Sequence, residues 1–185
     1  MTETKHKRAR KKRLAKLKAH VTHLELAHRM QRHIPVPIKP TLALMRAQHI
    51  PVPYYRYLYE MVGKPWHWEA RRKMTDKKLD QVINGPQAEI HVLYADGCPA
   101  GFFELNTEAL PDIVSIPYFG LGKAYQGVGV GKWFLSAAIG NAWVHNPQKL
   151  TVTTNTLDHP AALPLYQKLG FVPVAVSDEE ITPWE

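Results

Sequence analysis

The stretch Gln126-Gly127-Val128-Gly129-Val130-Gly131-Lys132 decides the fold, and it lies between an expected strand and an expected helix. Glycines let the backbone approach a ligand closely, and free N–H groups at a helix start favour phosphate oxygens. A P-loop would need glycine in place of Gln126 and Ser or Thr in place of Trp133. A dinucleotide-binding fingerprint would need its third glycine at Lys132. The pattern that fits is therefore Gln-x-x-Gly-x-Gly.

The hydrophobic pattern on both sides of this loop predicts an α/β sheet protein with about six strands and four helices. Pro117 lies inside one of the expected strands and cannot donate to a ladder, so it implies an edge or a bulge there. Thr75 can cap the start of one helix, Gly63, Asn84-Gly85 and Gly170 mark helix ends, and Asp96-Gly97 predicts a hairpin turn. Strands are expected over about 41–46, 90–94, 101–105, 112–121, 150–152 and 171–176, and helices over about 54–63, 75–85, 130–137 and 160–169.

A second motif, Ala162-Leu-Pro-Leu-Tyr-Gln-Lys-Leu-Gly-Phe171, follows the glycine loop after one expected helix and one expected strand. With the strand Ile116-Pro-Tyr-Phe-Gly-Leu121 and the loop itself, it makes the chain resemble the GCN5-related N-acetyltransferase (GNAT) superfamily. The resemblance covers about residues 41–176. It implies a mixed, mostly antiparallel sheet with splayed central strands, in a GNAT-like domain over residues 41–185.

The same resemblance implies that acetyl-CoA is the cosubstrate. The backbone of the strand after Pro117 would pair with the pantetheine arm, and the loop N–H groups would cradle the pyrophosphate. His159 stands where many relatives carry a cofactor-contacting asparagine, and it can still donate a hydrogen bond. The implied cofactor-binding residues are Phe119, Leu121, Gln126, Gly127, Val128, Gly129, Val130, Gly131, Lys132 and His159. No metal is expected, and the single cysteine excludes a Cys-rich zinc site.

Tyr166 occupies the position of the family's general acid, which would protonate the thiolate that leaves when an amine attacks the thioester. A base should also deprotonate the amine. Glu104 is the leading candidate, because a charged residue among Gly101, Phe102, Phe103 and Leu105 is costly to bury without a reason. A solvent-facing Glu104 on an alternating strand, with an ordered water as the base, is the alternative.

The resemblance implies a primary amine of a small molecule or a protein as the acceptor, and a donor longer than acetyl-CoA stays open. The acceptor is expected against the first two helices of the domain and their connecting loop. Trp66, Trp68, Tyr54 and Tyr57 make that region aromatic, although aromatic helix faces more often belong to a core. The sequence leaves the oligomeric state open.

The positive charge of the chain is concentrated at its beginning. Residues 1–40 hold twelve basic and two acidic residues, a net charge of +10, whereas residues 41–185 carry −2. Leu14, Leu17, Val21 and Leu24 follow spacings of three and four, which predicts an amphipathic helix in this arm. The Pro-rich stretch 33–40 predicts an extended linker, so residues 1–40 read as an arm outside the domain.

This arm supports a second hypothesis from another class of function. A nucleic acid or another anionic surface could bind residues 5–32, with the GNAT-like body serving as a scaffold or sensor. A solvated extension is the plainer interpretation of the same charges. No apolar run reaches the length of a membrane span, and the basic start lacks the apolar stretch of a signal peptide, so a cytoplasmic location is expected.

Overall fold

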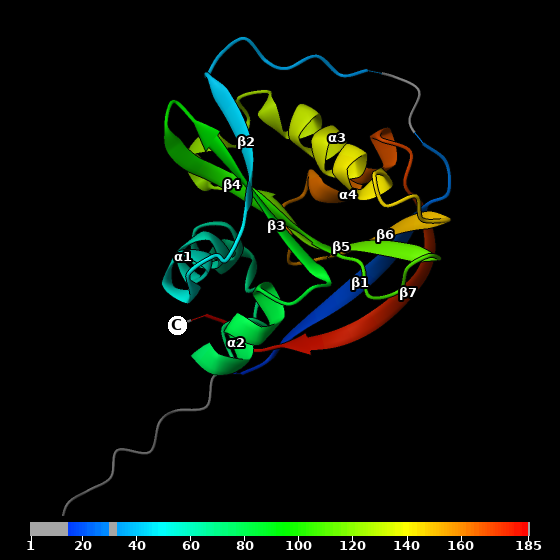
Figure 1. Cartoon of the computed structure of the whole chain (residues 1–185). Coiled ribbons are helices and arrows are strands. Elements are labelled where there is room, and N and C mark those ends of the chain that lie inside the picture. The colour runs from blue at the N-terminus through cyan, green and yellow to red at the C-terminus, as the bar shows by residue number, and fades with distance from the viewer. Residues whose placement is uncertain (1–14, 30–32, 185) are drawn as a thin grey trace, which may run out of the picture.

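A computed structural model of the chain describes residues 15–29 and 33–184 (Figure 1). Within these residues, seven strands form one sheet in the order β2-β3-β4-β5-β6-β1-β7. All neighbours are antiparallel except β5 and β6, which are parallel. The strands are β1 (Leu17–Leu26), β2 (Leu42–Ala47), β3 (Ala88–Ala95), β4 (Cys98–Asn106), β5 (Ile113–Leu121), β6 (Lys149–Asn155) and β7 (Val172–Ile181).

Helices cover both faces of the sheet. On one face α1 and α2 enclose a core with β3 and β4, and on the other α3 and α4 enclose a larger one (Figure 1). Among the described residues, no helix is long and apolar enough to cross a membrane. The helices are α1 (Val52–Gly63), α2 (Asp76–Ile83), α3 (Val130–Trp143) and α4 (Ala162–Lys168), with short 3-10 turns η1 (Lys64–Trp66) and η2 (Lys123–Tyr125). The predicted α/β fold is confirmed.

The sheet opens between β5 and β6. These strands pair only from Ile113 to Ile116 of β5, and the rest of β5 continues without β6. The β4–β5 register also shifts here, because three steps along β5 (Ser115 to Tyr118) match two along β4. Pro117 lies in this irregular stretch, where the missing N–H is tolerated. The predicted bulge and the splayed central strands are therefore both present.

The predicted helix in the N-terminal arm is wrong. Residues Leu17–Leu26 form β1, a strand in the interior of the sheet between β6 and β7. Ala19, Val21, Leu24 and Leu26 are buried, and a bulge between His23 and Leu24 breaks their alternation. Strand spacing of two, interrupted by one extra residue, gives spacings of four and three that imitate a helix. The sheet therefore includes residues that the sequence analysis placed outside the domain.

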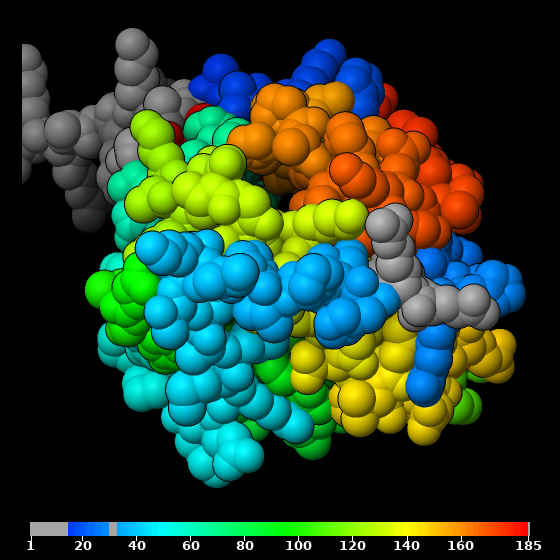
Figure 2. Space-filling view, turned by 90° about the horizontal axis from the view of Figure 1, so that it is seen from above, coloured from blue at the N-terminus to red at the C-terminus, as the bar shows by residue number. Residues whose placement is uncertain are grey.

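Several charges of the arm have partners within the molecule. On the β7 side, Lys16 forms an ion pair with Glu180 (2.8 Å) and His20 contacts Asp178 (2.5 Å). Beyond β1, Arg29 donates to the carbonyl of Trp143 (2.8 Å). Residues 5–14 and 30–32, which hold much of the predicted nucleic-acid-binding segment, lie outside the described residues. The segment from residue 33 to β2, light blue in Figure 2, crosses the surface as neither helix nor strand.

Candidate active site

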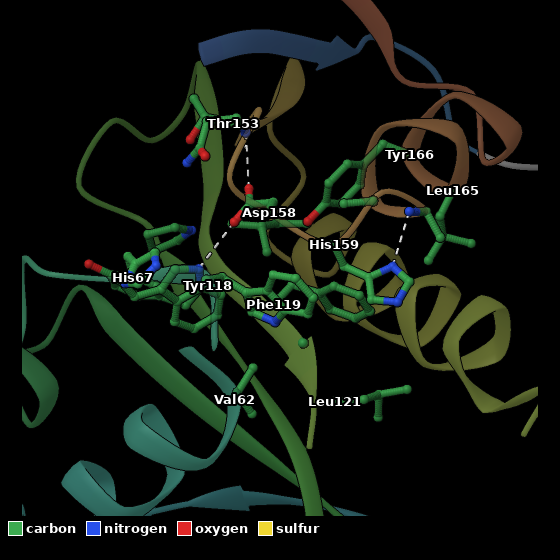
Figure 3. Close-up of a pocket in the computed structure, with 18 of the residues that line it drawn as sticks. Val62, His67, Tyr118, Phe119, Leu121, Thr153, Asp158, His159, Leu165 and Tyr166 are labelled. Carbon is green, nitrogen blue, oxygen red and sulfur yellow. Dashed lines mark hydrogen bonds between the residues drawn. The ribbon is translucent and has the colours of Figure 1, made fainter. Parts of the chain in front are cut away.

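A pocket of about 450 Å³ lies where β5 and β6 separate. One side is formed by the free part of β5, the glycine loop and α4, and the other by the loop after η1 and the end of β7. Figure 3 shows Tyr118, Phe119, Asp158, His159 and Tyr166 gathered around this space. The site is therefore assembled from elements on both faces of the sheet.

The free edge of β5 offers backbone groups to the pocket. Gly122 N–H donates to the carbonyl of Ala100 in β4, whereas the Leu121 carbonyl accepts from the side chain of Gln126 (3.0 Å). Because successive residues of a strand point their backbone groups to opposite sides, Leu121 and Phe119 both direct theirs away from β4. Both residues line the pocket, so an extended ligand can pair with this edge as an added strand would.

The glycine loop turns into α3 with its N–H groups uncovered. Gly127 and Gly129 have φ of +76° and +85°, and no atom lies within 4 Å of where a Cβ would stand. Gly129 is the N-cap of α3, and no side chain caps the helix. Positive φ explains why glycine occupies both positions, and the uncapped helix start attracts anions. Gln126, Gly127 and Gly131 line the pocket, whereas Val128, Gly129, Val130 and Lys132 lie outside its lining.

Tyr166 lies in α4 and faces the pocket (Figure 3). Its side chain is packed beside Phe119 and Phe171, and the residue is 6% exposed. Burial raises the pKa of Tyr166 above its usual value of 10, and the nearby charge of Asp158 adds to that shift. The phenol therefore holds its proton at neutral pH, which a general acid requires.

His159 lies at the pocket rim in front of α4. Its Nδ1 accepts a hydrogen bond from the backbone N–H of Ala161 (3.0 Å), and its ring meets Trp66 edge to face. Because Nδ1 is the acceptor, this contact assigns the neutral ring proton to Nε2. His159 can thus offer one donor to a ligand in the pocket, as expected from the sequence.

Glu104 is buried, but the structure places it outside the pocket lining. Its carboxylate accepts from the Tyr55 hydroxyl (2.7 Å) and forms an ion pair with Arg71. Burial raises the pKa of Glu104, and the Arg71 guanidinium and the Tyr55 hydroxyl oppose that shift. The reason for burying this charge is the partner Arg71, and a carboxylate engaged in this way is poorly placed to act as a base.

Three carboxylates that do line the pocket were not recognised in the sequence: Glu69, Asp158 and Glu179. Asp158 accepts from the Thr154 hydroxyl (2.8 Å), the Asn155 N–H (3.0 Å) and the Trp68 indole (3.4 Å). Its only sequence signal was its place beside His159 in the turn after β6. Glu69 and Glu179 carry no motif, because tertiary contacts alone bring them to this wall.

The C-terminal tail, residues 182–184, contacts the segment of η1 and the following loop that carries Trp66 and Trp68. The Trp184 indole donates to the carbonyl of Trp68 (2.8 Å), and the Thr182 N–H donates to Glu69 (2.7 Å). The guanidinium of Arg72 lies over the Trp184 ring, 4.8 Å from its centroid. Trp66 and Trp68 line the pocket as the sequence suggested, whereas Tyr54 and Tyr57 are not among its described lining residues.

These features fit a ligand that is extended at one end and anionic at the other. The β5 edge suits an extended chain with amide groups, and the uncapped start of α3 suits a phosphate group. A Cβ at Gly127 or Gly129 would stand in open space, so the cradle is not filled by the protein itself. Among the residues that the structure describes, no group of three or more His, Cys, Asp or Glu side chains could hold a metal ion.

Comparisons with known proteins agree with this geometry. The family described as "Acetyltransferase (GNAT) domain" matches residues 64–181, more than half of the chain. Among curated proteins, none matches the sequence.

Solved structures share the fold at low identity. A tandem GNAT protein from the clavulanic acid biosynthesis pathway is 16% identical, with 90% of this chain and 55% of that one covered (TM-score 0.64). A GCN5-related N-acetyltransferase from Kribbella flavida is 14% identical, with 92% of this chain and 61% of that one covered (TM-score 0.60). An IAA acetyltransferase from Bacillus cereus is 22% identical, with 73% of this chain and 79% of that one covered (TM-score 0.55). The chain spans 62%, 63% and 55% of the length of three solved structures with this fold, so part of each has no counterpart here. By its family match and its fold, the chain belongs to the GNAT acetyltransferase family.

Proposed function

We propose that the protein is an N-acetyltransferase that transfers an acetyl group from acetyl-CoA to a primary amine of a small molecule or a protein. The observation that carries the proposal is the free edge of β5, which lies beside an uncapped helix start and a buried, protonated tyrosine. These three features supply a place for an extended thioester, a place for phosphate and a proton donor.

The donor would be held by the residues expected from the sequence. Backbone groups of Phe119 and Leu121 would pair with the amide-containing arm, and Gln126 would brace the edge through the Leu121 carbonyl. N–H groups from Gly127 to Gly131 would receive the pyrophosphate, with Val128, Gly129 and Val130 forming the turn and Lys132 adding charge. The His159 Nε2–H would give a further hydrogen bond. Acetyl-CoA, when bound, supplies an acetyl group already activated as a thioester.

Tyr166 would act as the general acid. Its ordinary pKa of 10 is raised further by burial, so its hydroxyl keeps its proton at neutral pH, and its position in the pocket lining lets it protonate a departing thiolate. Glu104 takes a different part in this proposal. It fixes Arg71, whose guanidinium lies 5.3 Å from the centroid of the Tyr118 ring, and Tyr118 is a wall of the pocket.

Titration calorimetry with acetyl-CoA and an assay of released thiol test the proposal together. Acetyl-CoA should bind with a Kd on the micromolar scale typical of enzyme substrates. Tyr166→Phe should lower kcat by about 100-fold or more and leave acetyl-CoA affinity unchanged, because the proton donor is lost and the binding edge is kept. Tyr57→Phe is the matched control, since Tyr57 is 52% exposed. Absence of acetyl-CoA binding would refute the function, and an unaltered kcat in Tyr166→Phe would remove Tyr166 from the mechanism.

A further inference from the structure

The charges of the pocket lining have a single sign. Of the described residues that line the pocket, Glu69, Asp158 and Glu179 are acidic and none is Lys or Arg. Arg71 lies behind the Tyr118 wall, and its charge is compensated by Glu104. A pocket lined in this way favours cations and disfavours acceptors that carry a carboxylate near the amine.

The three carboxylates differ in whether a cation of the protein already compensates them. Glu69 forms an ion pair with Lys73 (2.7 Å) and accepts from Thr182 N–H. Asp158 receives only neutral donors, and Glu179 forms no ion pair with any described residue. Asp158 and the solvent-exposed Glu179 are therefore the two lining carboxylates that no cation of the described residues compensates.

Independent evidence that a ligand reaches this region comes from Tyr166. Its side chain is buried, its hydroxyl has no hydrogen-bond partner among the described residues, and Figure 3 shows it directed into the same space as Asp158. The hydroxyl is not among the buried unsatisfied atoms of the described residues, so it is open to the pocket and available to a ligand there. Asp158 thus lies where an amine about to react would meet the proposed proton donor.

The two free carboxylates lie on different elements. Asp158 is in the turn after β6, whereas Glu179 is on β7, two residues before the pocket-lining Ile181. Trp68, which donates to Asp158, and Trp66 form an aromatic wall in the same pocket. Aromatic faces suit both methylene chains and ammonium groups.

We propose that the acceptor is a diamine or polyamine whose reacting ammonium binds Asp158 and whose second ammonium binds Glu179. This inference rests on the proposed acetyltransferase function. In the reaction the amine nitrogen forms a bond to the acetyl carbon and the carbon–sulfur bond breaks. Two protons leave the nitrogen: Asp158 passes one to solvent, and the other reprotonates the phenolate that remains after Tyr166 has given its proton to the sulfur.

A set of acceptors with the same chain and different tails tests this directly. The probes are 1,6-diaminohexane, hexylamine and 6-aminohexanoate, with spermidine and 1,4-diaminobutane to vary the spacing. The value of kcat/KM should be highest for a diamine, whose second ammonium forms a partly exposed charge pair with Glu179. It should be about fivefold lower for hexylamine, which lacks that pair, and lower again for 6-aminohexanoate, whose carboxylate is repelled. Binding of the diamines to the protein without acetyl-CoA, followed by tryptophan fluorescence, gives a second readout.

Variants then assign the preference to single residues. Glu179→Gln should reduce the diamine-to-hexylamine ratio of kcat/KM to near one. Glu180→Gln should retain the ratio, because Glu180 pairs with Lys16 outside the pocket lining. Asp158→Asn should lower kcat/KM for every amine.

The outcomes separate this inference from the function on which it rests. Equal kcat/KM for all three tails, or acetyl-CoA binding without acetylation of any amine in the set, would overturn the diamine proposal and leave acetyl-CoA binding intact. Failure of acetyl-CoA to bind would overturn both.

Discussion

The two sides of the pocket are built in different ways. Most of the donor side, from Pro117 to Lys132, is one continuous stretch of chain: a strand edge, a glycine loop and a helix start, to which His159 and Tyr166 are added from farther along the chain. The acceptor side combines the loop after η1 with the turn after β6, 90 residues later at Asp158, and with the C-terminal tail, more than 110 residues later. Local sequence thus determines where a donor binds, whereas the acceptor wall depends on long-range contacts that can change without altering the donor side.

The largest effect is expected from removing Arg71, which lies in the loop after η1 and forms the buried ion pair with Glu104. Arg71→Met leaves the Glu104 carboxylate, which is 1% exposed, without its cation. The free energy of unfolding should fall by about 3–5 kcal/mol, as is usual when one partner of a buried pair is lost. Urea denaturation measures this loss.

Lys16→Met is the matched control, since the pair of Lys16 with Glu180 is exposed on both sides and should contribute about 1 kcal/mol or less. Similar losses of unfolding free energy in the two variants would show that the buried Arg71–Glu104 pair contributes no more than an exposed pair. Replacing both partners, in Arg71→Met with Glu104→Leu, should restore much of the stability, because no unpaired charge stays buried.

On the donor side, Gly129→Ala should weaken acetyl-CoA binding about tenfold. An alanine at φ +85° is strained by about 1–2 kcal/mol, and relaxation would turn the N–H groups at the start of α3 away from the phosphates. Calorimetry gives the Kd, and the KM for the acceptor should stay within twofold. Gly140→Ala on the same helix is the control: a Cβ there meets nothing within 4 Å, so this variant should gain about 0.5–1 kcal/mol in stability and keep the Kd.

The complementary change on the acceptor side is Trp184→Ala. It removes the hydrogen bond to the Trp68 carbonyl and the ring under Arg72, so the loop after η1 loses two of its contacts with the C-terminal tail. The KM for the amine should rise about fivefold to tenfold, equivalent to one lost hydrogen bond, while the Kd for acetyl-CoA is kept. Trp184→Phe retains the ring and should have a smaller effect. A parallel loss of acetyl-CoA affinity would show that the two sides are coupled.

The smallest expected effect is the pH dependence of stability that Glu69, on the acceptor side, contributes. Burial tends to raise the pKa of Glu69, but bonds from Lys73 and Thr182 outweigh it, and the pKa lies below its usual 4.5. The contribution of Glu69 is therefore fully present above pH 4.5 and is lost as the pH falls through the lowered value. Glu69→Gln should flatten this acid-side loss in thermal unfolding curves by less than about 1 kcal/mol. An unchanged slope would show that another group titrates there.

The sequence predicted what local chemistry determines. Thr75 caps α2 by accepting from the Lys78 N–H, the hairpin of β3 and β4 turns at Asp96-Gly97, and Pro117 lies at the irregularity in β5. Pro164 is tolerated in α4 because the helix begins at Ala162, so this proline falls in the first turn, where no N–H is needed.

What the sequence could not show depends on distant partners or on irregular geometry. The bulge at His23 in β1 disguised a strand as a helix, because one extra residue changes the apolar spacing. Glu104 was correctly singled out as an unusual charge, but its partner Arg71 comes from a loop 33 residues earlier in the chain. Glu69, Asp158 and Glu179 become neighbours of one pocket only through the tertiary fold.

The position of β1 has a consequence for how the molecule is made. During synthesis this segment leaves the ribosome before its partners β6 and β7, which follow more than 120 residues later, as the pairing of Leu26 with Leu150 and of Leu17 with Ile181 shows. Until then its apolar side chains have no sheet to join. The β1–β7 ladder therefore closes a loop of more than 160 residues, from Leu17 to Ile181, a slow, high-contact-order step. Without β1, β7 has no neighbour in the sheet, and without β7, β1 becomes the edge strand.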